Sequence, residues 1–311
     1  MKKLKFVVSL TTDDNDYQME QAVEASKVAA KLGVEIQIMY AENDAIVQSQ
    51  QLLKIIQSNT EPHPDGIIFE PVGGTAMPQV ARAAAAAGIG WVVLNREVDY
   101  LADLRRNFKV PLFSLTSDHE EIGRIQGRQI AALLPQGGSI LLIQGPAESL
   151  AARQRATGMQ ETKPSSVQVK GMKANWTEAS AYKTVTSWLK LSTSQPSTMS
   201  LIAAQDDSMS LGARKAFQEI PQSMAREQWL AMPFLGIDGM PKTGQAYVRQ
   251  GWLTATIIVP TNTGTAIEML TAAIRTGANP PEKTLIGAQS CPSIEELSRK
   301  RSQKGHASGK S

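Results

Sequence analysis

Short apolar runs alternate with helical patterns along almost the whole chain. The run at residues 5–10 (KFVVSL) has the character of a strand, and Met19, Ala22 and Ala29 then recur at helical spacing. The same strand–helix unit repeats to about residue 276. Because each strand is followed by a helix, the pattern predicts parallel sheets with right-handed crossovers and helices on both faces.

Each expected element is bounded by a change of pattern. Strands are expected at residues 5–10, 34–40, 66–69, 91–94, 112–115, 139–143, 167–172, 199–204, 234–237 and 253–258. Helices are expected at residues 19–32, 46–56, 77–87, 120–134, 149–162, 177–191, 208–217, 242–250 and 262–276. Residues 97–109 read as a charged connection and 221–229 as a loop. A break near residues 116–118 divides the units into two runs, which predicts two similar lobes.

The composition is that of an ordinary globular protein. With 311 residues the chain is long enough for two lobes with separate cores. Hydrophobic residues make up 42% and charged residues 20%, which disfavours disorder and fibrous folds. The net charge of +3 depends on five basic residues in the segment 299–310. The remaining body is slightly acidic, so we expect no nucleic-acid partner.

Cysteine content and the amino terminus bear on location. Cys291 is the only cysteine, so neither an intrachain disulfide nor a cysteine-based metal site is expected, and no cofactor or metal is implied. Residues 1–3 (MKK) resemble the start of a signal peptide, but the apolar run 6–10 is too short for one and is interpreted as the first strand. No run reaches the ~20 apolar residues of a membrane helix, so no membrane insertion is expected.

Acidic side chains follow two consecutive strands in the second half. The strand-like run near residue 204 ends in Gln205, Asp206 and Asp207, and a helical pattern begins at once. About two dozen residues later the next run ends in Asp238-Gly239. The carboxyl ends of parallel strands border the crevice in which open α/β sheets bind ligands, so these residues are candidates for ligand contacts.

These segments resemble a known family. The sequences AAQDDSMSLGA and GIDGM, followed by GWLTATI, are similar to the closing half of periplasmic sugar-binding proteins of the ribose-binding type, whose fold is shared by lactose-repressor-like effector domains. The resemblance covers roughly residues 4–290. It implies an α/β fold of two doubly wound parallel-sheet lobes joined by a three-strand hinge, the type I periplasmic binding protein-like fold. The implied parts are an N-terminal lobe (1–115 plus 260–284) and a C-terminal lobe (116–259 plus 285–292). Beyond them the sequence itself indicates a basic, disordered tail (293–311) that contains a short helical segment at 294–298.

The resemblance also implies which residues contact the ligand. In the first lobe, SLTTDDNDYQ matches the first strand-to-helix loop and WVVLNRE matches a strand that ends in Asp-Arg in the family. In the second lobe, AARQRATGM, ANWTEAS and the two acidic strand ends match ligand-binding segments. The candidates are Asn15, Tyr17, Gln18, Glu70, Asn95, Arg96, Arg155, Trp176, Asp206 and Asp238. Glu70 and Val259 stand where ribose binders usually have Asn and Gln.

The candidate side chains suit a polyhydroxylated ligand. Arg96 and Arg155 offer planar sets of donors, and Asp206 and Asp238 offer acceptors for vicinal hydroxyls. Tyr17 and Trp176 are expected to cover the apolar faces of a sugar ring. The five charged candidates, which include Glu70, carry a net charge of −1. This argues against an anionic ligand and permits a neutral sugar, a polyol or an amino sugar.

Structural roles are the alternative for several candidates. Asp206 and Asp238 could cap the helices that follow them, because aspartate is favoured there. Tyr17 and Trp176 could be packing residues, and Arg153 stands as close in the sequence as Arg155. The other tryptophans, Trp91, Trp188 and Trp252, follow apolar patterns and are assigned to the core or the lobe surface.

The sequence indicates a binder and not an enzyme. It contains three histidines and no metalloprotease, nucleophile-elbow or Cys–His pattern. We expect a monomeric solute-binding protein that clamps a small neutral or cationic carbohydrate-like ligand by hinge closure. It would act in the periplasm or cell envelope, in ABC-type sugar uptake or sensing, with a membrane permease or sensor as partner. The alternative, favoured by the lack of a signal peptide, is a cytoplasmic ligand-sensing regulator core without a DNA-binding domain.

Overall fold

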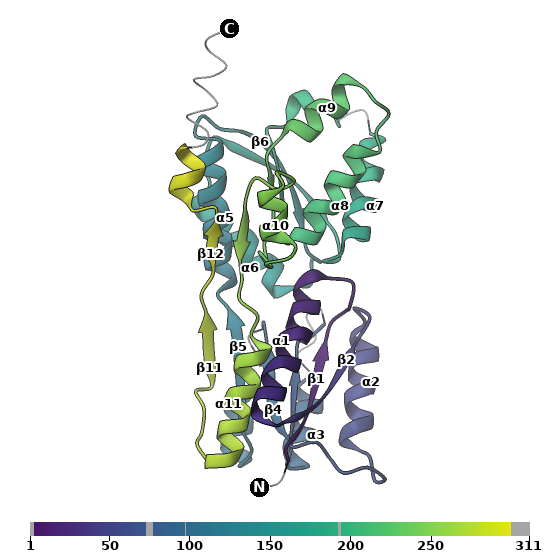
Figure 1. The fold of residues 1–311 in the computed structure, drawn as a ribbon, viewed down its shortest axis with the longest axis vertical. Helices are drawn as coiled ribbons and strands as arrows, with labels where there is room; N and C mark the ends of the chain where they lie inside the picture. Colours follow the sequence, from purple (N-terminus) through teal and green to yellow (C-terminus); the bar gives the residue numbers. More distant parts are fainter. Residues whose placement is uncertain (1–2, 73–76, 97, 192–193, 300–311) are drawn as a thin grey trace. The chain divides into compact units, whose positions relative to one another are not determined.

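Two compact units make up the chain (Figure 1). The computed structural model describes residues 3–72, 77–96, 98–191 and 194–299. Unit 1 contains the residues up to Ser117 and the segment Thr261–Ile286, and unit 2 contains Asp118–Pro260 and the residues from Gly287 onward. The chain passes between the units after Ser117, Pro260 and Ile286. Each passage lies within two residues of a lobe boundary that the family resemblance implies, at 115/116, 259/260 and 284/285.

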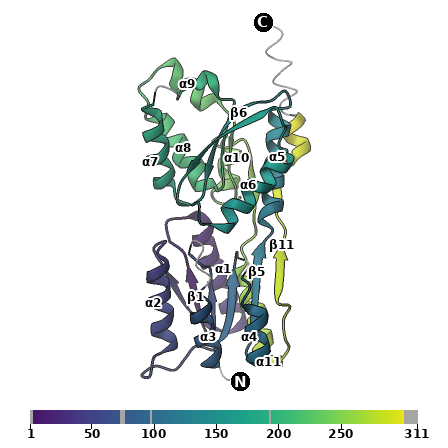
Figure 2. The same cartoon turned by 180° about the vertical axis from the view of Figure 1, so that it is seen from behind.

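Unit 1 is built on a six-stranded parallel sheet in the order β11-β5-β4-β3-β1-β2. Its strands are β1 (Lys5–Leu10), β2 (Glu35–Tyr40), β3 (Gly66–Phe69), β4 (Gly90–Leu94), β5 (Leu112–Ser117) and β11 (Lys283–Ile286). Its helices are α1 (Asp16–Leu32), α2 (Ala45–Ile56), α3 (Pro78–Ala86), α4 (Leu101–Asn107) and α11 (Thr263–Thr276). Helices α1 and α11 cover one face of the sheet, and α2, α3 and α4 cover the other (Figure 2).

The pleat of β1 explains why both faces are covered. Phe6, Val8 and Leu10 point into the core beneath α1 and α11, whereas Val7 points into the core beneath α2 and α3. All four are at most 3% exposed. Because successive side chains point to opposite faces, a strand with apolar residues on both faces is stable only when both sides are covered.

Unit 2 has the same layered plan with a smaller sheet. Strands β6 (Gly138–Gln144), β7 (Val167–Lys173), β8 (Leu201–Ala204) and β9 (Phe234–Leu235) are parallel in the order β7-β6-β8-β9. Strands β10 (Thr256–Ile258) and β12 (Gln289–Cys291) form an antiparallel pair. The helices are α5 (His119–Leu133), α6 (Leu150–Thr162), α7 (Glu178–Leu189), α8 (Asp207–Gln218), α9 (Met224–Ala231) and α10 (Gly244–Arg249), with a 3-10 turn at Pro196–Thr198. Helices α5 and α6 cover one sheet face, and α7, α8 and α9 cover the other.

Two segments that the sequence indicates as connections are helical. In place of the charged connection 97–109, helix α4 buries Leu101 and Leu104, each 1% exposed, one turn apart beneath a charged outer face. In place of the loop 221–229, helix α9 places Trp229 in a stack on Phe217 with a 4.7 Å centroid distance. Both helices are short, so each offers only one or two apolar positions per face, too few to establish a period.

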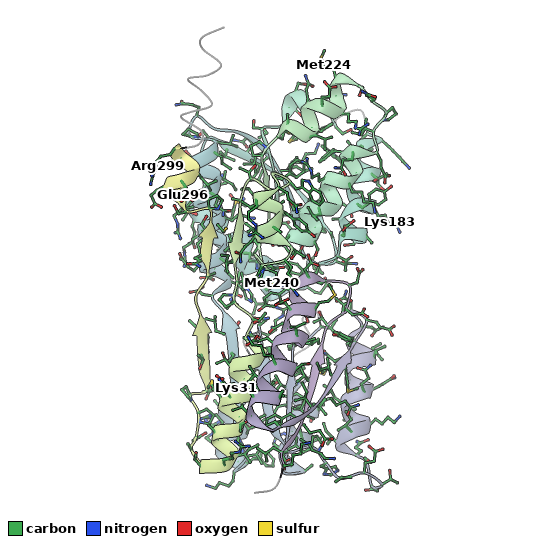
Figure 3. All side chains as sticks on the ribbon, in the orientation of Figure 1. Lys31, Lys183, Met224, Met240, Glu296 and Arg299 are labelled. Carbon is green, nitrogen blue, oxygen red and sulfur yellow. The ribbon has the colours of Figure 1, made fainter. Side chains whose placement is uncertain are left out.

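Part of the expected basic tail is ordered. Residues 294–299 are helical, and Leu297 is 2% exposed in the core beneath α5 and α6. Glu296 and Arg299 lie on the exposed side of this turn (Figure 3). The short helix expected at 294–298 is therefore present and extends by one residue, and residues 300–311 lie outside the described residues. Across the ranges that the structure describes, none of the helices has both the length and the apolar character needed to cross a membrane.

Candidate functional site

In unit 1, polar side chains gather where β1, β3 and β4 end. Asn15 caps α1, and its side-chain oxygen accepts a hydrogen bond from the backbone N–H of Gln18 at 3.1 Å. This cap fixes the first turn of the helix. The Gln18 side chain then donates through Nε2 to Oε2 of Glu70 at 2.9 Å. The candidates Asn15, Gln18 and Glu70 therefore belong to one cluster.

Glu70 follows β3 directly and is held from several sides. Its backbone N–H donates to the carbonyl of Ser9 at 2.9 Å, and Nε2 of Gln48 donates to its backbone carbonyl at 2.8 Å. On the side chain, Oε2 also accepts from Nδ2 of Asn95 at 3.0 Å. Glu70 is only 6% exposed, so its carboxylate is fixed in a buried position.

Asn95 connects the remaining unit 1 candidates. Its Nδ2 lies 3.3 Å from the hydroxyl of Tyr17, and its backbone carbonyl accepts from Nη1 of the half-buried Arg96 at 2.8 Å. The backbone of Asn95 has a φ of 54°, in the left-handed region. Asparagine tolerates this region better than most residues, but the conformation still costs free energy.

Sequence reasoning missed two buried amides that support this cluster. Nδ2 of Asn262, just before α11, donates to Oδ1 of Asn95 at 2.8 Å. Gln21 of α1 donates through Nε2 to Oδ1 of Asn262 at 2.6 Å, and both residues are fully buried. They orient Asn95 by joining α1 to the start of α11. Asn262 could have been predicted from the sequence, because it lies in a strand-to-helix loop directly before a helix, as Asp206 does.

In unit 2, Arg155 is the centre of the second cluster. Its Nη1 donates to the backbone carbonyl of Gln205 and lies 3.9 Å from Oδ1 of Asp238. The side chains of Arg155 and Asp238 are each 8% exposed. The guanidinium carbon lies 5.6 Å from the ring centroid of Trp176, at cation–π distance. Arg153, the alternative in the sequence, is exposed and donates to the carbonyl of Ala147, so it does not belong to this cluster.

Trp176 and Asp238, like Asn95, have a positive backbone φ angle. Trp176 has a φ of 63°, and Asp238 has a φ of 109°. The Trp176 ring lies so close to Gly145 that a Cβ at that position would overlap the ring. The ring is thus held between a glycine backbone and a guanidinium group.

The two acidic candidates of unit 2 differ in local role. Asp206 caps α8, and its Oδ1 accepts from the backbone N–H of Met209 at 2.6 Å. The capping alternative is therefore correct for Asp206. Asp238 caps no helix, because the next helix begins at Gly244 behind the cap residue Thr243. The backbone of Asp238 instead pairs with Ile257 and Val259.

Asp207, noted in the sequence as an acidic residue at the strand end but not among the ten site candidates, also supports the site. Its Oδ2 accepts from the backbone N–H of Gly239 at 2.7 Å, and its Oδ1 accepts from Oγ1 of Thr256 at 2.7 Å. The neighbouring Gln205 accepts from the N–H of Gly145 at 3.0 Å. These buried side chains join the carboxyl ends of neighbouring strands, and so fix the loop that carries Asp238 and the glycine, Gly145, against which the Trp176 ring packs.

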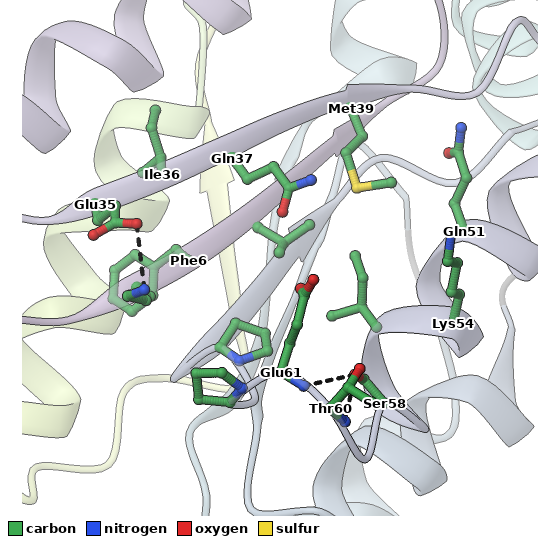
Figure 4. A pocket seen from close by; sticks show the side chains of 15 residues that line it. Phe6, Glu35, Ile36, Gln37, Met39, Gln51, Lys54, Ser58, Thr60 and Glu61 are labelled. Atoms are coloured by element: carbon green, nitrogen blue, oxygen red, sulfur yellow. Dashed lines mark hydrogen bonds and ion pairs between the residues drawn. The ribbon is translucent and has the colours of Figure 1, made fainter.

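A surface pocket lies elsewhere in unit 1. It has a volume of about 710 Å³ and is lined by the first residues of β1 and β2, by α2 and by the loop 58–64 (Figure 4). None of the ten candidates lines it. Parallel sheets bind ligands at the carboxyl ends of their strands, whereas this pocket lies at the amino ends. Among the described residues, no group of three or more His, Cys, Asp or Glu side chains could hold a metal ion.

The chain belongs to the family described as the periplasmic binding protein domain, whose model matches residues 6–278. It is 25% identical over 258 residues to the ribose import binding protein of Escherichia coli, covering 83% of this chain and 79% of that protein. It is 29% identical over 201 residues to a protein of Rhizobium meliloti named for rhizopine binding, covering 62% of this chain and only 60% of that relative.

Solved structures confirm the fold. The Caulobacter myo-inositol binding protein, solved with myo-inositol bound, superposes with a TM-score of 0.77 at 19% identity. The superposition covers 95% of this chain and 96% of that protein. The expected type I periplasmic binding protein-like fold with two lobes is therefore confirmed.

Proposed function

We propose that this protein is a solute-binding protein that reversibly holds a small carbohydrate-like ligand between its two lobes. One observation carries the proposal: three of the predicted ligand residues, Asn95, Trp176 and Asp238, have left-handed backbones. Only six non-glycine residues of the described chain do so. Such conformations cost about 1–3 kcal/mol each, and they cluster at binding sites because the surrounding structure fixes side chains in a required place.

The chemistry of both clusters suits vicinal hydroxyl groups. Arg155 supplies donors, Asp238 supplies an acceptor, and Trp176 supplies an aromatic face for the C–H groups of a ring. In unit 1, Gln18 and Asn95 supply amide groups next to a carboxylate. The relatives named above are named for binding ribose, rhizopine and myo-inositol. Ribose and myo-inositol are small polyhydroxylated molecules, which supports a ligand of this class.

We propose ligand uptake, with a membrane permease of ABC type as the partner, as the role of the complex. The matched relative from E. coli is an import binding protein, which supports uptake over the regulator alternative. Family members are periplasmic, and we propose the periplasm or cell envelope as the location and a monomer as the working form. A sensor reading the ligand-bound form is the related possibility, since both uses require the same binding step.

The proposal is tested by binding and product analysis together. A thermal-shift screen of sugars, polyols and amino sugars should give a ligand of monosaccharide size, and titration calorimetry should confirm one site per chain. The recovered ligand should be chemically unchanged, because the proposed action is binding without turnover. Conversion of the ligand, or binding of sugar phosphates in preference to all uncharged compounds, would contradict the proposal.

A further inference from the structure

Glu70 carries a charge that no described residue neutralises. Its carboxylate accepts two hydrogen bonds, from Gln18 and Asn95, and both go to the same oxygen, Oε2. Within the described residues, no hydrogen bond reaches Oε1 and no lysine, arginine or histidine forms an ion pair with this carboxylate. The residue is nevertheless 6% exposed. One oxygen of this buried carboxylate, Oε1, is therefore left without a hydrogen-bonding or ionic partner among the described residues.

The acidic candidates of unit 2, unlike Glu70, lie next to groups that offset their negative charge. Asp238 has the guanidinium of Arg155 at 3.9 Å. Asp206 accepts a backbone N–H at the start of α8, where the helix dipole stabilises a negative charge. Among the described residues Glu70 has no guanidinium group beside it. It also lies at no helix start, because the next helix, α3, begins only at Pro78. Of the three carboxylates, Glu70 alone has neither a cationic partner nor a helix N-terminus among the described residues.

A buried carboxylate is a costly way to accept a hydrogen bond from a neutral hydroxyl. An amide oxygen would accept the same bond without the desolvation penalty of a charge, and amides already stand beside it at Gln18 and Asn95. A charged acceptor gains most when the ligand brings the opposite charge, because each group then offsets the desolvation of the other. A metal ion is a poor fit, since the described residues contain no cluster of three ligating side chains.

The position of Glu70 is also well fixed for such a contact. Gln48, fully buried, donates to the Glu70 carbonyl at 2.8 Å and to Oγ of Ser9 at 3.1 Å, and its own side-chain oxygen accepts from the N–H of Val72. The Glu70 backbone is therefore held on both sides. A preorganised acceptor loses little conformational entropy when it binds a ligand group.

Building on the proposed function, we propose that the ligand is an amino-substituted polyol or sugar and that Glu70 pairs with its ammonium group. The ammonium would donate to Oε1, while the hydroxyls of the same molecule use the amide and guanidinium groups. Charge-assisted hydrogen bonds are stronger than neutral ones, and the expected preference for an amine over its hydroxyl counterpart is roughly tenfold to a hundredfold in Kd.

The test uses matched sets of three compounds. Aminocyclitols and amino sugars, among them scyllo-inosamine and glucosamine, are titrated beside the compounds in which a hydroxyl or an N-acetyl group replaces the amine. We expect the tightest ligand to be an amine and both counterparts to bind at least tenfold more weakly. An uncharged compound as the tightest ligand, or an amine within threefold of its counterparts, would overturn the inference while leaving the proposed function standing. If no compound of any set binds, the proposed function itself fails.

A pair of variants locates the effect. Glu70→Gln keeps the size of the side chain and removes its charge, so it should abolish the preference for the amine: the amine should lose at least tenfold in affinity and bind no more tightly than its hydroxyl counterpart. Glu24→Gln, on α1 with a side chain 31% exposed and paired with Lys27 at 3.3 Å, should change neither affinity. Equal loss of both ligands in a folded Glu70→Gln variant would contradict the inference. If melting curves show that this variant does not fold, the wild-type comparison of the three compounds decides alone.

Discussion

The pair formed by Arg155 and Asp238 shows how one residue can be both strained and stabilising. Asp238 has a φ of 109°, yet its carboxylate lies 3.9 Å from the buried guanidinium of Arg155. The unfavourable backbone is retained where the side chain neutralises a buried charge. In the proposed function the same oxygen atoms accept hydrogen bonds from ligand hydroxyls, so removing the charge should affect binding more than folding.

The first prediction concerns Asp238→Asn. Asparagine tolerates the left-handed region and keeps the shape of the side chain, so the fold should survive. Because charge-assisted hydrogen bonds contribute about 1.5–3 kcal/mol each, the ligand should bind roughly tenfold to a hundredfold more weakly. Calorimetric titration beside a melting curve measures both effects. Asp44→Asn, which changes the exposed cap of α2, is the control and should leave affinity unchanged.

The second prediction concerns Trp176→Leu. If the ring stacks on the ligand, this substitution should weaken binding by about 1–3 kcal/mol, because it removes an aromatic face. Trp252→Leu is the matched control: Trp252 is 45% exposed, and its ring stacks on Tyr247 with a centroid distance of 5.4 Å. Both variants are titrated with the same ligand. Unchanged affinity in Trp176→Leu would place the ring outside the site and put the role of Arg155 beside it in doubt.

Helices α5 and α6 approach each other closely through glycines. A Cβ on Gly158 would overlap the backbone carbonyl of Glu120, and a Cβ on Gly123 would overlap that of Arg155. Since Arg155 lies one turn before Gly158 on α6, the packing of this helix pair also sets the position of the guanidinium group. A change in the packing of α5 against α6 should therefore also move the Arg155 side chain in the candidate site.

The third prediction follows from this packing. Gly158→Ala should lower the free energy of unfolding by about 1–3 kcal/mol, because overpacking forces the helix pair apart. It should also weaken ligand binding through displacement of Arg155. Gly171→Ala on the edge strand β7 is the control, since the nearest atom to its added Cβ lies at an ordinary 3.4 Å. Equal melting temperatures for the two variants would contradict the packing argument.

At the element scale, the sequence predicts most strands and long helices well, because their apolar periods extend over several turns or a whole strand. Strand 66–69 and β3 have the same bounds. The short helices α4 and α9 are not predicted, because each has too few apolar positions to define a buried face. Roles that depend on contacts between residues far apart in the sequence are also not predicted. The residues next to Asp207 in the sequence do not indicate that its carboxylate joins Gly239 to Thr256. The ten site residues rest on motif matches and remain predictions.

At the scale of the whole molecule, the two units are joined by three chain passages, after Ser117, Pro260 and Ile286. Each unit has its own sheet and its own pair of cores, so each can move as a body. Hinge closure of two such domains around a ligand is a known mode of switching, for which periplasmic binding proteins are a standard example. Ligand contacts that exist only in the closed form would shift the population towards it.

The last prediction is that ligand binding makes the protein more compact in solution. A ligand that contacts both clusters gains its full affinity only when the lobes close, so saturation should reduce the radius of gyration in small-angle scattering. Asp238→Asn should show only partial compaction at the ligand concentration that saturates the wild type, but full compaction once the ligand is raised tenfold to a hundredfold. The population shift depends on occupancy and not on the residue itself, so the two proteins should superimpose when plotted against bound fraction. A saturated wild type with an unchanged radius would show that binding does not close the lobes, and would remove the physical basis for a permease that distinguishes loaded from empty protein.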